Sequence, residues 1–200
     1  MKFNVPTKLT FLRIILAVLI IILLLFPFHA IGIEFPTILY KDILIELKYL
    51  IAGVMFIFAS VTDYFDGKLA RKNNQVTNFG KMIDSIADKV LVNSVLIIFA
   101  CQGHISAVIP TVIIVRDIIV DAIKMSTAKQ GSVQAAIMSG KIKTATLMIG
   151  MVLTFFYNLP FQLWNLQVAD FLLYFGAIMS IISMLEYYKI NKKMIFAEFD

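Results

Sequence analysis

Six stretches of the sequence are mostly apolar and long enough to cross a lipid bilayer, a pattern that leaves few choices of fold. About 20 predominantly apolar residues in a helix span the hydrocarbon core. The first stretch contains an unbroken apolar run from Ile14 to Phe26. The predicted spans cover residues 9–28, 43–64, 80–101, 108–125, 140–157 and 168–188.

The composition supports the same class of protein. Of the 200 residues, 60% are hydrophobic and only 16% are charged, and a soluble domain of this length could not bury so much apolar surface. We therefore expect an all-α polytopic membrane protein, with six transmembrane helices in a single domain over residues 1–200 and a short amphipathic N-terminal segment. The first span is expected to be retained, because no small-x-small cleavage site follows it.

Lys and Arg gather in alternate connections. Three lie at the N-terminus, five between residues 63 and 89, five between residues 116 and 143 and three at the C-terminus, whereas the other connections contain only Lys41 and Lys48. The positive-inside rule then places both termini and the connections after spans two and four in the cytoplasm. Although the net charge is +5, the basic residues are dispersed among apolar spans. We expect a lipid surface and acidic substrates as partners, and no nucleic acid.

Four aspartates lie around the connection between spans two and three. Two sets of acidic and small residues follow the spacing of one helical face. The sets are Asp63, Asp66, Gly67 and Ala70 before the connection, and Gly80, Asp84 and Asp88 after it. The polar connection, residues 72–79, suits an antiparallel helix pair. The two carboxylate stripes are therefore expected to face each other across one cleft.

This arrangement predicts a metal-dependent phosphoryl-transfer site. Carboxylates this close repel one another unless cations offset their charge. Carboxylate oxygens without His or Cys suit hard ions such as Mg²⁺, Mn²⁺ or Ca²⁺, and two such ions could neutralise a pyrophosphate. A solvated acidic helix end is the alternative. Gly67, Ala70 and Gly80 weigh against it, because they remove side-chain bulk where a ligand would approach the backbone.

The same residues resemble the signature of the CDP-alcohol phosphotransferases, D-x-x-D-G-x-x-A-R followed by G-x-x-x-D-x-x-x-D. Every defined position is occupied, by Asp63, Asp66, Gly67, Ala70, Arg71, Gly80, Asp84 and Asp88. The N-terminal PTKLTFLR is also similar to a Pro-Asn-x-Leu-Thr-x-x-Arg motif of relatives, with Thr7 in place of Asn and with Arg13 matching. Members commonly have Pro where this chain has Ser85.

The resemblance implies roles for these residues. Two Mg²⁺ or Mn²⁺ ions would be bound by Asp63, Asp66, Asp84 and Asp88. The pocket for CDP-diacylglycerol would be shaped by Asp66, Gly67, Ala70, Arg71 and Gly80. Asp88 is the candidate general base for the acceptor hydroxyl. The resemblance also suggests a homodimer. The distribution of Lys and Arg places the active site on the cytoplasmic side of the cell membrane.

Two basic motifs resemble the branch of this family that transfers a phosphatidyl group from CDP-diacylglycerol to glycerol 3-phosphate. They are IVRD in span four, which contains Arg116, and GKIKT at the start of span five, which contains Lys141 and Lys143. These three residues are expected on the cytoplasmic side, where they would bind the phosphate of the acceptor. Anchoring at the membrane interface is the alternative.

Other polar residues are interpreted as structural. Asp117 and Asp121 are expected to form helix ion pairs with Arg116 and Lys124. A histidine in each of two extracytoplasmic connections, His29 and His104, is expected to be solvated.

Two alternative functions stay open. The acceptor could be inositol, a phosphorylated inositol, serine or phosphatidylglycerol. A divalent-cation transporter could also use intramembrane carboxylates, although no internal repeat of the kind common in transporters is visible.

Overall fold

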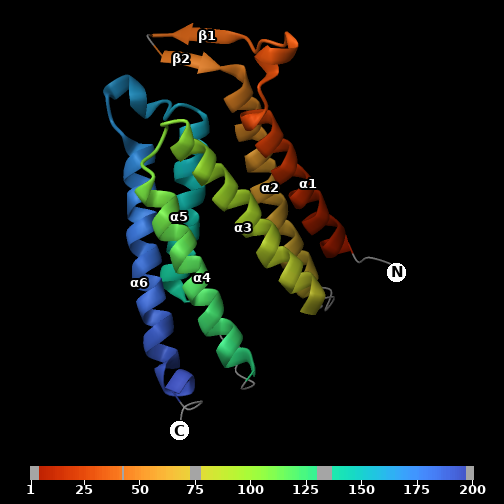
Figure 1. Cartoon of the computed structure of the whole chain (residues 1–200), viewed down its shortest axis with the longest axis vertical. Helices are drawn as coiled ribbons and strands as arrows, with labels where there is room; N and C mark the ends of the chain where they lie inside the picture. Colours follow the sequence, from red (N-terminus) through yellow and green to blue (C-terminus); the bar gives the residue numbers. More distant parts are fainter. Residues whose placement is uncertain (1–4, 42, 73–77, 130–136, 197–200) are drawn as a thin grey trace.

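A computed structural model describes residues 5–41, 43–72, 78–129 and 137–196, and the side chains of residues 9–41, 43–62, 80, 82–127 and 137–192. Its helices in chain order are α1 (Val5–Leu25), α2 (Leu47–Lys72), α3 (Asn78–Cys101), α4 (Val108–Lys129), α5 (Met138–Phe155) and α6 (Val168–Phe196) (Figure 1). Short 3-10 helices cover Phe28–Ile31 and Phe161–Trp164. The described residues are mostly helical, in agreement with the predicted all-α class apart from one short β-hairpin.

The helix starts agree with four of the predicted helical segments, and their crossing of a membrane stays a prediction. Helices α4 and α6 begin at the predicted residues 108 and 168, and α3 and α5 begin two residues early. Helix α1 ends before Pro27, which lacks an N–H group and cannot continue the hydrogen-bonding pattern. Helix α1 begins at Val5, so residues 5–8 of the expected amphipathic N-terminal segment are continuous with the first predicted span.

A β-hairpin occupies the predicted start of span two, and this prediction was wrong. Strands β1 (Thr37–Tyr40) and β2 (Ile43–Glu46) pair antiparallel, with Tyr40 opposite Ile43, and α2 begins only at Leu47. Branched and aromatic residues on both sides of a polar break favour a hairpin over a helix. Lys41 takes the positive φ of 44° that the tight turn requires.

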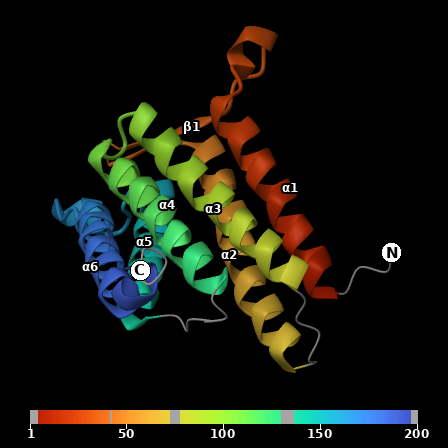
Figure 2. The ribbon, with the colours of Figure 1, turned by 60° about the horizontal axis from the view of Figure 1, so that its bottom comes forward.

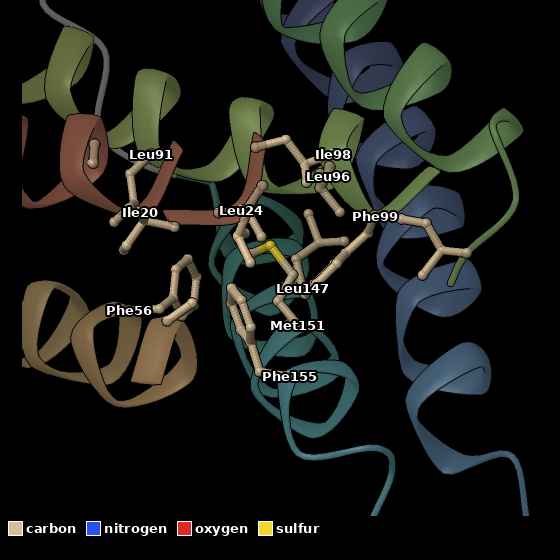
Figure 3. Close-up of a cluster of buried hydrophobic side chains, with 14 of the residues drawn as sticks. Ile20, Leu24, Phe56, Leu91, Leu96, Ile98, Phe99, Leu147, Met151 and Phe155 are labelled. Carbon is tan, nitrogen blue, oxygen red and sulfur yellow. The ribbon is translucent and has the colours of Figure 1, made fainter. Parts of the chain in front are cut away.

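The core is formed mainly by α1, α2, α3 and α5, with further buried residues from α4 and α6 (Figure 3). The Phe155 ring of α5 lies 4.6 Å from the ring of Phe99 on α3 and 5.5 Å from that of Phe56 on α2. Gly53 permits this contact, because a Cβ there would lie only 2.8 Å from the Cβ of Phe155. A small residue at a helix contact is typical of packing within a bilayer, where backbones must approach closely.

The helices form two groups joined by this core. Helix α1 packs against both α2 and α3, while α6 packs against α4 and α5 (Figures 1 and 2). Figure 1 shows the hairpin at one end of the helices and both chain termini toward the other. Since α2 ends and α3 begins at the end away from the hairpin, the aspartates lie at the end where the basic connections gather.

One described helical stretch, Val168–Lys192, is by itself long and apolar enough to cross a membrane, and Leu9–Leu25 and Leu47–Thr62 are shorter apolar stretches. In helices α3 and α4, charged residues interrupt the apolar sequence. These charged residues contribute to the candidate site.

The two histidines behave differently. His29 is exposed, as predicted. His104 is partly buried, with its ring 4.8 Å from that of Tyr49, so the prediction of a solvated side chain was wrong there. This burial lowers the pKa of His104.

Candidate active site

The aspartates of the signature lie on α2 and α3. Helix α2 contains five of the predicted site residues, whose side chains are outside the described residues: Asp63, Asp66, Gly67, Ala70 and Arg71. On α3, Asp84 and Asp88 are four residues apart and therefore lie on one helical face, and both are partly exposed. The helical placement of both sets is confirmed. The facing of the two carboxylate stripes stays a prediction.

Arg13 brings α1 into the aspartate region. Its side chain is 1% exposed, and Nη1 donates a hydrogen bond to Oδ1 of Asp84 at 2.9 Å. The Asp84 side chain is 42% exposed, so one end of this ion pair is buried and the other reaches solvent. The sequence resemblance singled out Arg13 without a role. A charged arginine within an apolar span is energetically costly unless it is paired. The presence of Arg13 in such a span was therefore the sequence signal for a buried ion pair.

The described side chains provide part of a ligand set for a hard divalent cation. Asp84 and Asp88 offer carboxylate oxygens, the ligands that Mg²⁺ and Mn²⁺ prefer. Among the described side chains, no group of three or more His, Cys, Asp or Glu residues could bind a metal ion. A complete ligand set would therefore need Asp63 and Asp66 from α2.

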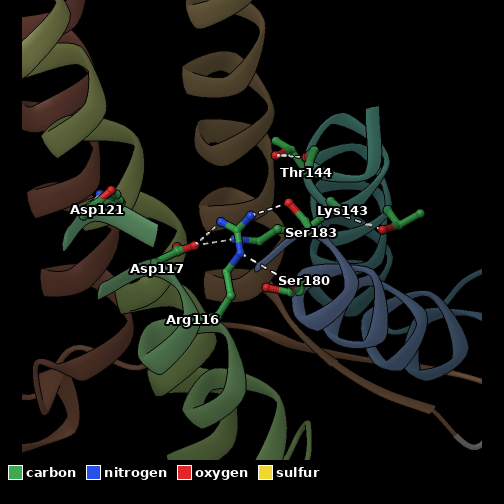
Figure 4. Close-up of polar contacts among 10 residues, drawn as sticks. Arg116, Asp117, Asp121, Lys143, Thr144, Ser180 and Ser183 are labelled. Atoms are coloured by element: carbon green, nitrogen blue, oxygen red, sulfur yellow. Dashed lines mark hydrogen bonds and ion pairs between the residues drawn. The ribbon is translucent and has the colours of Figure 1, made fainter. Parts of the chain in front are cut away.

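A second charged cluster joins α4 and α5 (Figure 4). Oδ1 of Asp117 accepts hydrogen bonds from Nη1 of Arg116 at 2.9 Å and from Nζ of Lys143 at 2.6 Å. Arg116 is 9% exposed and Lys143 is 8% exposed. Because one oxygen contacts both cations, the carboxylate brings together two like charges that would otherwise repel each other.

Helix α6 completes the surroundings of Arg116. Nε donates to the main-chain carbonyl of Ser180 at 3.2 Å, and Nη2 donates to Oγ of Ser183 at 2.6 Å. The guanidinium carbon also lies 6.0 Å from the centre of the Tyr187 ring. No sequence motif pointed to these three residues, which lie more than 60 positions from Arg116.

The interpretation of Asp117 and Asp121 as local ion pairs was half right. Asp117 does pair with Arg116, but it also binds Lys143 on another helix. Asp121 pairs with Lys89 of α3, whereas Lys124 lies over the Tyr187 ring at 5.1 Å. Residue spacing along one helix cannot identify ion-pair partners on neighbouring helices.

A small cavity connects the two charged regions. Asp88 of α3, Asp117 of α4 and Lys143 of α5 all line it, and its volume is about 30 Å³. Asn93 also lines it, with a buried Oδ1 that has no hydrogen-bond partner among the described residues. The candidate base and part of the basic cluster thus border one space. Lys141 differs, because its side chain is exposed and lies outside the described lining.

A larger cavity of about 420 Å³ lies at the hairpin end and is lined by His104, Tyr157 and Asp170 among others. Asp84 and Asp88 are not among its lining residues, so size alone does not identify the candidate site.

The chain belongs to the CDP-alcohol phosphatidyltransferase family, whose profile matches residues 3–185. This finding confirms the resemblance in the signature and makes the chain a transferase.

Its relatives include a CDP-diacylglycerol–glycerol-3-phosphate 3-phosphatidyltransferase of Bacillus subtilis, 38% identical over 189 residues, which are 94% of this chain and 95% of the relative. The protein of the same name from Haemophilus influenzae is 35% identical over 96% of this chain and 95% of its own length. That from Mycoplasma genitalium is 42% identical over 58% of this chain and 49% of its own length.

Proposed function

We propose that this protein transfers the phosphatidyl group of CDP-diacylglycerol to glycerol 3-phosphate, which yields phosphatidylglycerophosphate and CMP. Family membership supports the reaction class, and the names of the relatives support this acceptor. The observation that carries the proposal is the Arg116–Asp117–Lys143 cluster, of which Asp117 and Lys143 line the same cavity as Asp88.

The aspartates would bind the metal ions and the donor lipid. The metal ligands are Asp63, Asp66, Asp84 and Asp88, and the CDP pocket is formed by Asp66, Gly67, Ala70, Arg71 and Gly80. When bound, two Mg²⁺ or Mn²⁺ ions neutralise the pyrophosphate of CDP-diacylglycerol. The acyl chains of the donor stay in the bilayer.

Asp88 would act as the general base. Its carboxylate accepts the proton of an acceptor hydroxyl while the hydroxyl oxygen forms a bond to the lipid-side phosphorus. The bond from that phosphorus to the bridging oxygen breaks, and CMP leaves with this oxygen on its phosphate. The shared cavity supports this role, because an acceptor bound by Lys143 would lie beside Asp88.

Arg116 and Lys143 would bind the phosphate of the acceptor. The described contacts use three of the five N–H groups of Arg116 and one of the three of Lys143, which leaves donors for an anion. Asp117 offsets one of the two positive charges of Arg116 and Lys143. A dianionic phosphate would be attracted by the remaining positive charge, whereas an uncharged polyol would not. Lys141, being exposed, would attract the acceptor from greater distance.

The protein would cross the cell membrane six times, with both termini and the site in the cytoplasm. Large apolar side chains on the outer surface of α6 support insertion, as Phe171 is 67% exposed, Ile178 56% and Leu185 49%. These residues recur every seven positions and therefore form one stripe that lipid would cover. A homodimer is part of the proposal on the strength of the family resemblance.

Substitution of the basic residues tests the proposal. Arg116→Ala and Lys143→Ala should each raise the KM for glycerol 3-phosphate at least about tenfold, the effect of losing a charged hydrogen bond, with little change in CDP-diacylglycerol binding. Lys141→Ala serves as the exposed control and should change this KM by less than about threefold. If Arg116→Ala and Lys143→Ala leave the KM unchanged, the basic cluster does not bind the acceptor and the argument for a phosphorylated acceptor fails.

A further inference from the structure

The guanidinium of Arg116 is oriented from two sides. Asp117 binds Nη1 from within α4, and α6 binds the other two nitrogens through the Ser180 carbonyl and the Ser183 hydroxyl (Figure 4). A planar guanidinium with its nitrogens fixed in this way has little freedom to rotate. The direction of its remaining N–H groups is therefore set by α6 as well as by α4.

We infer that Ser183 is a positioning residue for acceptor recognition. Ser183 orients the guanidinium of Arg116 toward the phosphate of the acceptor. The inference rests on the proposed function and extends it to α6, a helix that carries none of the residues of the family signature. Ser183 acts through Arg116 and does not itself contact substrate.

The surroundings of Ser183 favour a strong contact with Arg116. Ser183 is 0% exposed, so water does not compete for its hydroxyl, and Oγ lies 2.6 Å from Nη2. Hydrogen bonds to a charged donor are about twice as strong as those between neutral groups. Gly140 of α5 leaves room for this hydroxyl, because a Cβ at that position would lie 3.3 Å from Oγ of Ser183.

Ser180 provides a matched control on the same helix. Like Ser183 it is 0% exposed, and it lies almost one helical turn away. Its contact with Arg116 uses the main-chain carbonyl, and its own hydroxyl has no hydrogen-bond partner among the described residues. Replacement of either serine by alanine removes one buried hydroxyl, but only Ser183→Ala removes a hydrogen bond to Arg116.

The experiment measures KM values for both substrates with full-length enzyme in mixed micelles. Ser183→Ala should raise the KM for glycerol 3-phosphate at least about fivefold, somewhat less than the loss of a direct charged hydrogen bond. Ser180→Ala should leave this KM within about twofold of wild type, and the KM for CDP-diacylglycerol should change by less than about twofold in both variants.

A double-mutant cycle separates positioning from packing. If Ser183 acts only through Arg116, Ser183→Ala should have no further effect on the KM for glycerol 3-phosphate in an Arg116→Ala enzyme. Equal KM values for Ser183→Ala and Ser180→Ala, or an undiminished effect of Ser183→Ala without Arg116, would overturn the inference. Should Ser183→Ala fail to fold, Ser183→Cys keeps a similar volume with a poor acceptor and should raise the same KM. A wild-type enzyme that releases no CMP with glycerol 3-phosphate would instead refute the proposed function itself.

Discussion

The ion pair between Arg13 and Asp84 ties α1 to the aspartate helix, and its two ends should respond unequally to substitution. Asp84→Asn leaves the charge of Arg13, 1% exposed, without the carboxylate that accepts its Nη1, whereas Arg13→Met leaves a carboxylate that is 42% exposed and can be hydrated. Removing one partner of a fully buried pair costs about 3–5 kcal/mol, and a lost charged hydrogen bond costs about 1.5–3 kcal/mol. We expect Asp84→Asn to lower the free energy of unfolding by about 3 kcal/mol and Arg13→Met by about 1.5 kcal/mol.

The assay is unfolding by SDS in mixed micelles, followed by circular dichroism, with EDTA present so that metal binding does not contribute. The double variant should give a coupling energy of at least about 1.5 kcal/mol. The control is the Glu46–Lys48 pair, which has a similar N–O distance of 2.8 Å but side chains that are 39% and 26% exposed. Its coupling should stay below about 1 kcal/mol. Equal coupling in the two pairs would refute the reasoning from burial.

Three further predictions concern topology, catalysis and pH. In a Cys101→Ser background, a cysteine at Asn74 should react with an impermeant thiol reagent only from the cytoplasmic face and one at His104 only from the opposite face; the reverse labelling would contradict the proposed topology. Asp88→Asn should lower kcat more than it weakens CDP-diacylglycerol binding, and a parallel loss of both would point to metal binding or structure alone. Because burial lowers the pKa of His104, the folded state binds fewer protons than the unfolded state. Its contribution to stability should be complete above the ordinary histidine pKa of about 6.5 and decline as the pH falls below it. His104→Phe should flatten this decline in SDS unfolding measurements, and an unchanged pH dependence would exclude His104 as its cause.

Local sequence patterns predicted the helices except for the start of α2. Apolar runs bounded by polar connections predicted helices that begin near residues 108 and 168, where α4 and α6 do begin. The segment from Thr37 to Glu46 was misjudged, because apolar content alone does not separate a short strand from the first turn of a helix. Its polar break at Lys41 was the signal for a hairpin.

These sequence patterns could not predict the contacts between helices. The periodicity of α3 placed Asp84 and Asp88 on one face, but it could not identify Arg13 as the partner of Asp84, 71 positions away. The pairing of Asp121 with Lys89 was misassigned for the same reason. Serine is common in membrane helices, so nothing in the sequence distinguished Ser183, whose part depends on how α6 packs against α4.

The most direct test of the account is the acceptor dependence of CMP release by the wild-type enzyme. Purified protein in mixed micelles would receive CDP-diacylglycerol and Mg²⁺ together with glycerol 3-phosphate, inositol, a phosphorylated inositol, serine, phosphatidylglycerol or no acceptor. We predict that CMP release, and a matching amount of phosphatidylglycerophosphate, requires glycerol 3-phosphate and stops when EDTA removes the metal. CMP release that is equally fast with inositol or serine, or none with glycerol 3-phosphate, would contradict the proposed function.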